Sequence, residues 1–135
     1  MGTVIFPDTN VLLRYLLADI EEQYQEICPF FEDLRQGYQK AIILPEVLLE
    51  TFYVLTKTYS IPARETAEAL KDLLLYRGVV NRDKKVLLEA LNLFFESEGL
   101  IWLECFLCVK AHKQKGEILT FDKKLKHRCS KFFEA

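Results

Sequence analysis

Four carboxylates stand where an acidic side chain needs an explanation. Asp8 follows a short apolar run and precedes a helical pattern, and Asp122 ends the apolar stretch "EILTFD". Glu50 lies in "LLETFYVL" and Glu104 in "LIWLECFLC", among residues expected in the core. A carboxylate in such surroundings is costly unless it is paired or coordinated. If the four acids converge, they form a charged site that requires a coordinated partner.

Each acid also has a purely structural interpretation. Asp8 could act as a helix N-cap, because it stands at a strand-to-helix junction and could accept backbone N–H bonds. Glu50 or Glu104, taken singly, could occupy the exposed edge of an apolar helix. Glu46 shares the helical face of Glu50 and is interpreted as a surface or accessory residue.

Short apolar segments alternate with amphipathic segments along the chain, which is typical of a parallel sheet covered by helices on both faces. We therefore predict an α/β fold in a single domain, residues 1–135. Ligands of such sheets bind at the carboxyl ends of the strands, where Asp8 and Asp122 are both expected. The expected strands are 3–6, 41–44, 79–80 and 117–122.

Glycine and proline mark the expected helix boundaries. A helix is expected over about 9–17, and a second one begins after Asp19 and ends at Gly37. Pro29 implies a kink or break of this second helix near Cys28. Pro45 fits the first turn of the next helix, and residues 62–78 form another amphipathic pattern. Two further helices are expected to break at Gly99, the second of them ending at Gly116.

Composition places the chain among globular proteins. Half of its 135 residues are apolar, with ten Phe and six Tyr, so a core can form without disulfides or metal. No apolar run reaches the length of a membrane span, and the N-terminus does not resemble a secretory signal, so a cytoplasmic protein is expected. The cysteines are expected to be free thiols. The alternative, a zinc site at Cys105, Cys108 and His112, lacks a second ligand pair.

The C-terminal segment is basic. From Cys105 onwards eight Lys and Arg face three acids, a net charge of +5, whereas the preceding residues hold ten against seventeen, a net charge of −7. The cluster "KKLKHR" follows Asp122 directly and could hold a polyanion there. The alternative is a solvated helix face.

Three motifs resemble PIN-domain proteins, particularly the short VapC-like toxins of prokaryotic toxin–antitoxin pairs. They are "DTNVLLRYLL" near the N-terminus, "LLETFYVLTKTYSIPARETAEAL" in the middle and "LTFDKKL" near the end. The motifs run in the family's order and cover essentially the whole chain. The resemblance implies a three-layer fold with a short parallel sheet of about four to five strands.

The resemblance implies metal-dependent hydrolysis of RNA phosphodiester bonds. Mg²⁺ or Mn²⁺ would relieve the repulsion among the acids and activate water for in-line attack. Asp8, Glu104 and Asp122 are the implied metal ligands, and Glu50 either binds metal or orients the water. The polar positions that support the acids in the family are matched by Asn10 and Thr120. Residues that could hold RNA phosphates are Lys123, Lys124, Lys126 and Arg128.

Two positions depart from the family pattern. Glu104 stands where relatives have Asp, and Ile101 occupies a place where many relatives carry a further acid. A longer side chain shifts a ligand by about an ångström, which can lower a rate around a hundredfold. A catalytically weak or inactive module that binds RNA or protein is therefore the alternative function. The resemblance also implies an antitoxin partner and a homodimer.

Overall fold

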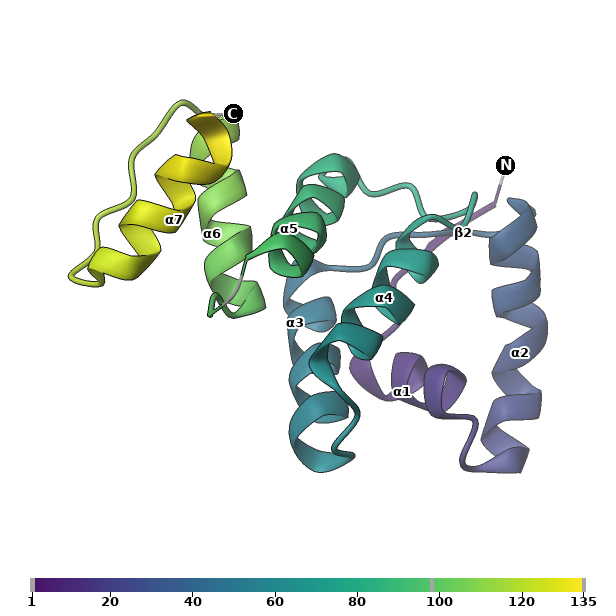
Figure 1. Ribbon diagram of the computed structural model, residues 1–135. Coiled ribbons are helices and arrows are strands. Elements are labelled where there is room, and N and C mark those ends of the chain that lie inside the picture. Colours follow the sequence, from purple (N-terminus) through teal and green to yellow (C-terminus); the bar gives the residue numbers. More distant parts are fainter. Residues whose placement is uncertain (1, 98, 135) are drawn as a thin grey trace. The chain divides into compact units, whose positions relative to one another are not determined.

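The structure is a computed structural model that describes residues 2–97 and 99–134 (Figure 1). The chain divides into two compact units, Met1–Arg82 and Asp83–Ala135, and each is described by itself. Among the helices that the structure describes, none combines the length and the apolar character that a membrane span requires.

In residues 2–82 the structure describes a small sheet and five helical segments. Helix α1 packs against α2 and α3, and α4 packs against α3. Leu12, Phe31, Leu48 and Leu70, one from each of these helices, are fully buried and form the core. The elements are β1 (Val4–Ile5), α1 (Thr9–Leu17), α2 (Glu21–Gln36), β2 (Lys40–Ala41), α3 (Pro45–Tyr53), the π-helix η1 (Val54–Thr58) and α4 (Ala63–Leu74).

The sheet is parallel, as the sequence predicts, and β2 is its central strand. Ile5 pairs with Ala41, and the Ile42 N–H donates to the Ile5 carbonyl at 2.9 Å. On the opposite edge of β2, the Ala41 N–H donates to Gly78 and the Ala41 carbonyl accepts from Val80, at 2.8 and 2.9 Å. These bonds make a single parallel bridge between Ala41 and Val79. The α/β class is therefore correct.

The predicted number of four to five strands is wrong, because the structure describes two strands and one bridge. Next to the bridge, the side chain of Asn81 replaces backbone pairing. Its Oδ1 accepts from the Ile43 N–H at 2.9 Å and its Nδ2 donates to the Ile43 carbonyl at 2.6 Å. Asn81 is only 7% exposed, so it satisfies both backbone groups of a buried residue without a strand.

The expected strand 117–122 is also wrong. These residues have no regular secondary structure, and the side chains of Leu119 and Phe121 are fully exposed. A strand is stable only where another strand completes its hydrogen bonds. No such pairing of this segment is found among the described residues.

The second unit consists of helices α5 (Lys84–Glu96), α6 (Trp102–Lys113) and α7 (Lys123–Glu134). Helix α6 packs against both α5 and α7 (Figure 1). Leu91, Trp102 and Leu125 are buried, one on each helix. The predicted break between α5 and α6 is confirmed, and Gly99 lies there with φ of 88°, which favours glycine.

Helix α2 runs without a break from Glu21 to Gln36, so the break expected near Pro29 does not occur. The proline removes one backbone hydrogen bond, while the fully buried Phe31 and Leu34 hold the following turns in the core. The predicted end of this helix is correct. Gly37 caps it with φ of 88° and donates its N–H to the last turn.

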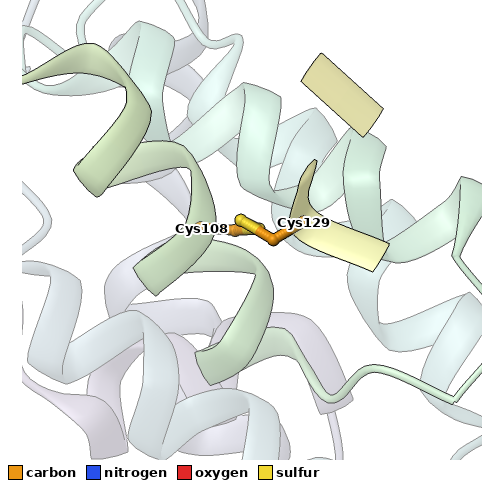
Figure 2. The surroundings of a disulfide bond; sticks show 2 residues. All are labelled: Cys108 and Cys129. Atoms are coloured by element: carbon orange, nitrogen blue, oxygen red, sulfur yellow. A yellow bond between two sulfur atoms is a disulfide. The ribbon is translucent and has the colours of Figure 1, made fainter. Parts of the chain in front are cut away.

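Two of the cysteines are not free thiols, which corrects the expectation. Cys108 on α6 and Cys129 on α7 form a disulfide with Cα atoms 5.7 Å apart (Figure 2). The bond also removes Cys108 from the zinc ligand set considered above. Cys28 and Cys105 are free, and burial raises the pKa of the Cys105 thiol to about 12. Cys105 is therefore an uncharged core residue near neutral pH.

Replacing Cys129 with Ser is expected to lower the free energy of unfolding of the second unit by about 3 kcal/mol, because the disulfide closes a loop of 21 residues. Urea denaturation with and without dithiothreitol measures this effect. The control is Cys28→Ser, which leaves the disulfide intact. The expectation fails if the reductant destabilises wild type no more than it destabilises the Cys129 variant.

Candidate active site

Asp8 joins the end of the first strand segment to helix α1. Its backbone is extended, and its Oδ1 accepts the Val11 N–H at 2.9 Å, so it is the N-cap of α1. The structural interpretation of Asp8 is thus present in the fold. Its second oxygen, Oδ2, has no hydrogen-bond partner among the described residues, and a capping aspartate can still bind a cation through that atom.

Glu50 is exposed rather than buried, although its neighbours Leu48, Thr51 and Phe52 are buried. The helical spacing of α3 turns these three side chains inwards and Glu50 outwards. The Thr9 hydroxyl of α1 donates a hydrogen bond to Glu50 Oε1. This bond fixes the carboxylate beside the N-terminus of α1.

Asp8 and Glu50 line one pocket of 620 Å³. The pocket lies between α1 on one side and α3 with η1 on the other. Asn10 also lines this pocket, and its supporting role stays a prediction. The other polar residues of the pocket are Thr9, Arg14, Thr58 and Tyr59.

Arg14 and Tyr59 line the same pocket and contact each other. The Arg14 Nη2 donates to the Tyr59 hydroxyl at 3.2 Å, and Nη1 contacts both carboxylate oxygens of Asp19 at 2.9 and 3.1 Å. The Tyr59 hydrogen bond and the Asp19 charge raise the pKa of Arg14 above its ordinary value. The guanidinium is therefore a permanent cation committed to these two partners.

Glu104 and Asp122 lie in the second unit, each at the start of a helix. Glu104 Oε1 accepts the Ile101 N–H at 3.1 Å and so caps α6. Asp122 Oδ1 accepts the N–H groups of Lys124 and Leu125 at 2.9 and 3.2 Å at the start of α7. Each carboxylate lies at the N-terminal end of a helix, where the positive end of the helix dipole stabilises its negative charge.

Thr120 contacts the backbone of Asp122, and its supporting role at the site stays a prediction. Its hydroxyl oxygen accepts the Asp122 N–H at 3.0 Å and fixes the turn before α7. Asp8 and Glu50 are thus brought together within the first unit, and Thr120 and Asp122 within the second. In the part of the chain that the structure describes, no three His, Cys, Asp or Glu side chains form a group that could hold a metal ion. Convergence of all four acids stays a prediction.

The basic residues after Asp122 lie on α7. Lys123, Lys124 and Lys126 are exposed, whereas Arg128 is half-buried. The Arg128 guanidinium carbon is 3.7 Å from the point where a Cβ on Gly99 would stand. The lysines are therefore available to an anionic ligand, and Arg128 also packs over the turn between α5 and α6.

Sequence reasoning missed Thr9, Arg14 and Tyr59. Thr9 stands inside the motif "DTN", directly after Asp8, and Arg14 lies four residues after Asn10 on the same helical face. Those spacings place both residues near the acids. No local pattern identifies Tyr59, because its contact to Arg14 spans 45 residues of sequence.

The resemblance carried by the three motifs agrees with the comparison to known proteins. A VapC ribonuclease from Aquifex aeolicus (strain VF5) is 31% identical over 120 residues, which cover 88% of this chain and 87% of that protein. No solved structure matches the chain. Residues 5–131 match the PIN domain, nearly the full length. The resemblance inferred from the motifs is therefore confirmed, and the chain belongs to the PIN-domain family.

Proposed function

We propose that the chain is a metal-dependent endoribonuclease that hydrolyses RNA phosphodiester bonds and acts as the toxin of a toxin–antitoxin pair. The observation that carries the proposal is the pocket shared by Asp8 and Glu50. These two acids belong to two of the three motifs that resemble the family. The related VapC ribonuclease supports the choice of RNA as substrate.

The residues of this pocket fit a hard divalent cation. Asp8, Glu50 and Asn10 offer carboxylate and amide oxygens, which Mg²⁺ and Mn²⁺ prefer, and Asp8 Oδ2 has no other partner among the described residues. A bound cation would supply positive charge for the scissile phosphate and would lower the pKa of a bound water. We therefore assign Mg²⁺ or Mn²⁺ as the cofactor.

The proposal gives each acid a role. Asp8, Glu104 and Asp122 are the metal ligands, and Glu50 binds metal or orients the attacking water. Thr9 holds Glu50 in one orientation, and Thr120 holds the turn at Asp122. Glu104 and Asp122 each use one oxygen to cap a helix, which leaves the other oxygen for the cation. The longer side chain of Glu104 and the apolar Ile101 favour a slower enzyme than relatives with Asp and a further acid.

The proposal treats residues 1–135 as one PIN-like domain. It also includes a cytoplasmic location, a homodimer and an antitoxin that inhibits the enzyme. Co-expression with the product of a neighbouring small reading frame tests the antitoxin. Sedimentation of the purified chain tests the dimer.

Titration calorimetry with Mn²⁺ and Mg²⁺, combined with cleavage assays on a panel of single-stranded RNAs, tests the central proposal. Saturable binding of the metal and cleavage that EDTA abolishes are the expected results. RNA binding without cleavage in either metal would overturn the nuclease assignment and would make the chain a binding module.

Replacing Lys123, Lys124 and Lys126 together with Gln is expected to weaken RNA binding in a salt-dependent way. A plot of the logarithm of the association constant against the logarithm of the salt concentration has a negative slope. Each lost phosphate contact makes this slope shallower by about 0.7, so the loss of three contacts makes it shallower by about 2. Fluorescence anisotropy at several salt concentrations measures the slope. Lys85→Gln is the matched control, because Lys85 is an exposed lysine on α5. An unchanged slope would exclude these lysines from the RNA-binding surface.

A further inference from the structure

The pocket of the first unit has two ends of different chemistry. At one end the Thr9 hydroxyl meets Glu50, and at the other the Arg14 guanidinium meets Tyr59. Thr9 and Arg14 are five residues apart on one helix, so the rise between their Cα atoms is about 7.5 Å along α1.

The π-helix η1 determines where Tyr59 lies. Its Tyr59 N–H donates to the Val54 carbonyl five residues earlier, at 3.3 Å. A π-turn carries one more residue than an α-turn, and such turns are frequent at functional sites. The wider turn follows α3 directly, so the residue after η1 lines the same pocket as Glu50.

Tyr59 is held at its hydroxyl and is partly exposed. The hydroxyl accepts from Arg14, and Arg14 is itself fixed by both oxygens of Asp19. The tyrosine nevertheless remains 40% exposed. A fixed, half-open aromatic ring loses little conformational entropy when a flat ligand stacks on it.

We propose that Tyr59 is a stacking platform for a base of single-stranded RNA whose neighbouring phosphate lies at Asp8 and Glu50. The identity of the ligand rests on the proposed function. An exposed aromatic side chain recognises unpaired bases, because their flat faces are free only when the strand is splayed open. Every base has such a face, so the platform fixes the position of the strand without specifying its sequence.

The arrangement assigns Arg14 a positioning role. Its charge is already paired with Asp19, and its remaining contact goes to Tyr59. A phosphate would meet the acids of the pocket through a bound cation, and the base beside that phosphate would meet the ring of Tyr59.

The test measures the affinity for a short single-stranded RNA by fluorescence anisotropy, in the Asp8→Asn background to prevent cleavage. Tyr59→Ala is expected to weaken binding about tenfold or more, and Tyr59→Phe and Tyr59→Trp to retain most of the affinity. Tyr38→Ala is the matched control, since Tyr38 is 76% exposed in the same unit and does not line the pocket.

A second series separates stacking from a purely structural effect. An abasic site is moved along the RNA one position at a time. In the protein that retains Tyr59, one abasic position should weaken RNA binding about as much as Tyr59→Ala does. In the Tyr59→Ala variant, an abasic site at that same position should cause no further loss of affinity. Equal affinities for Tyr59→Ala and its parent, or losses that do not depend on the abasic position, would overturn the proposal.

The two proposals fail in different ways. If wild type cleaves RNA and the KM does not change in Tyr59→Ala, the platform is wrong and the nuclease assignment stands. If wild type does not cleave RNA but binding depends on Tyr59 and on one base, the nuclease assignment is wrong and the platform stands.

Discussion

Replacing Asp8 with Asn is expected to abolish metal-dependent RNA cleavage and to leave the fold intact. Asparagine caps a helix about as well as aspartate, so the hydrogen bond from Val11 is retained. The amide carries no charge and binds a divalent cation weakly. Loss of one charged ligand removes several kcal/mol of stabilisation from the transition state, which lowers the rate about a thousandfold or more. Initial rates in Mn²⁺ and the thermal melting temperature measure both effects.

Control variants separate the two roles of Asp8, which are metal binding and helix capping. Asp8→Ala should lose activity and also about 1 kcal/mol of stability, because alanine cannot accept the Val11 N–H. Asp72→Asn should change neither quantity, because Asp72 is an exposed acid of α4 that does not line the pocket. Full activity of Asp8→Asn would reduce Asp8 to a helix cap.

Replacing Gly78 with Ala is expected to destabilise the first unit by about 3 kcal/mol or more. A Cβ at this position would stand 2.0 Å from the Gln39 carbonyl oxygen and 2.8 Å from that of Leu34. The backbone there cannot move freely, because the Gly78 N–H donates to the Leu34 carbonyl and the Gly78 carbonyl accepts from the Ala41 N–H, both at 2.8 Å. Overpacking of this kind distorts the sheet edge rather than a single side chain. Urea denaturation of the first unit measures the loss.

Gly116→Ala is the matched control for this prediction. A Cβ at Gly116 would meet nothing closer than the Ala111 carbonyl oxygen at 3.6 Å, which is an ordinary contact. The free energy of unfolding of the Gly116→Ala variant should therefore stay close to that of wild type. A Gly78 variant as stable as the Gly116 variant would contradict the close approach of these backbone segments.

Local sequence patterns predicted the helices well and the sheet poorly. Pro45 at the first turn of α3 and Gly37 after α2 are local signals, and both boundaries are correct. The sheet depends on partners that are distant in sequence. Asn81 satisfies Ile43 with its side chain across 38 residues, and no periodicity reveals such a contact. The expected strand 79–80 is reduced to a bridge, because the Asn81 side chain takes the place of backbone pairing next to it.

The same limit applies to the candidate site. Asp8 and Glu50 could be selected from the sequence, because each acid stands next to apolar residues. Their common pocket depends on the contact between Thr9 and Glu50, which spans 41 residues. The π-helix was also missed, since "VLTKT" continues the helical pattern of α3. Chemistry-bearing residue types are visible in the sequence, whereas the residues that orient them come from tertiary contacts.

The exposed segment 117–122 has a practical consequence for the variants of Asp122. Leu119 and Phe121 are fully exposed, and the acids Glu117 and Asp122 flank them. Charges on either side of an apolar stretch act as gatekeepers against aggregation. Asp122→Asn, made to test a metal ligand, therefore also removes a gatekeeper. Its activity can be compared with that of wild type only at a concentration where light scattering finds both proteins equally dispersed.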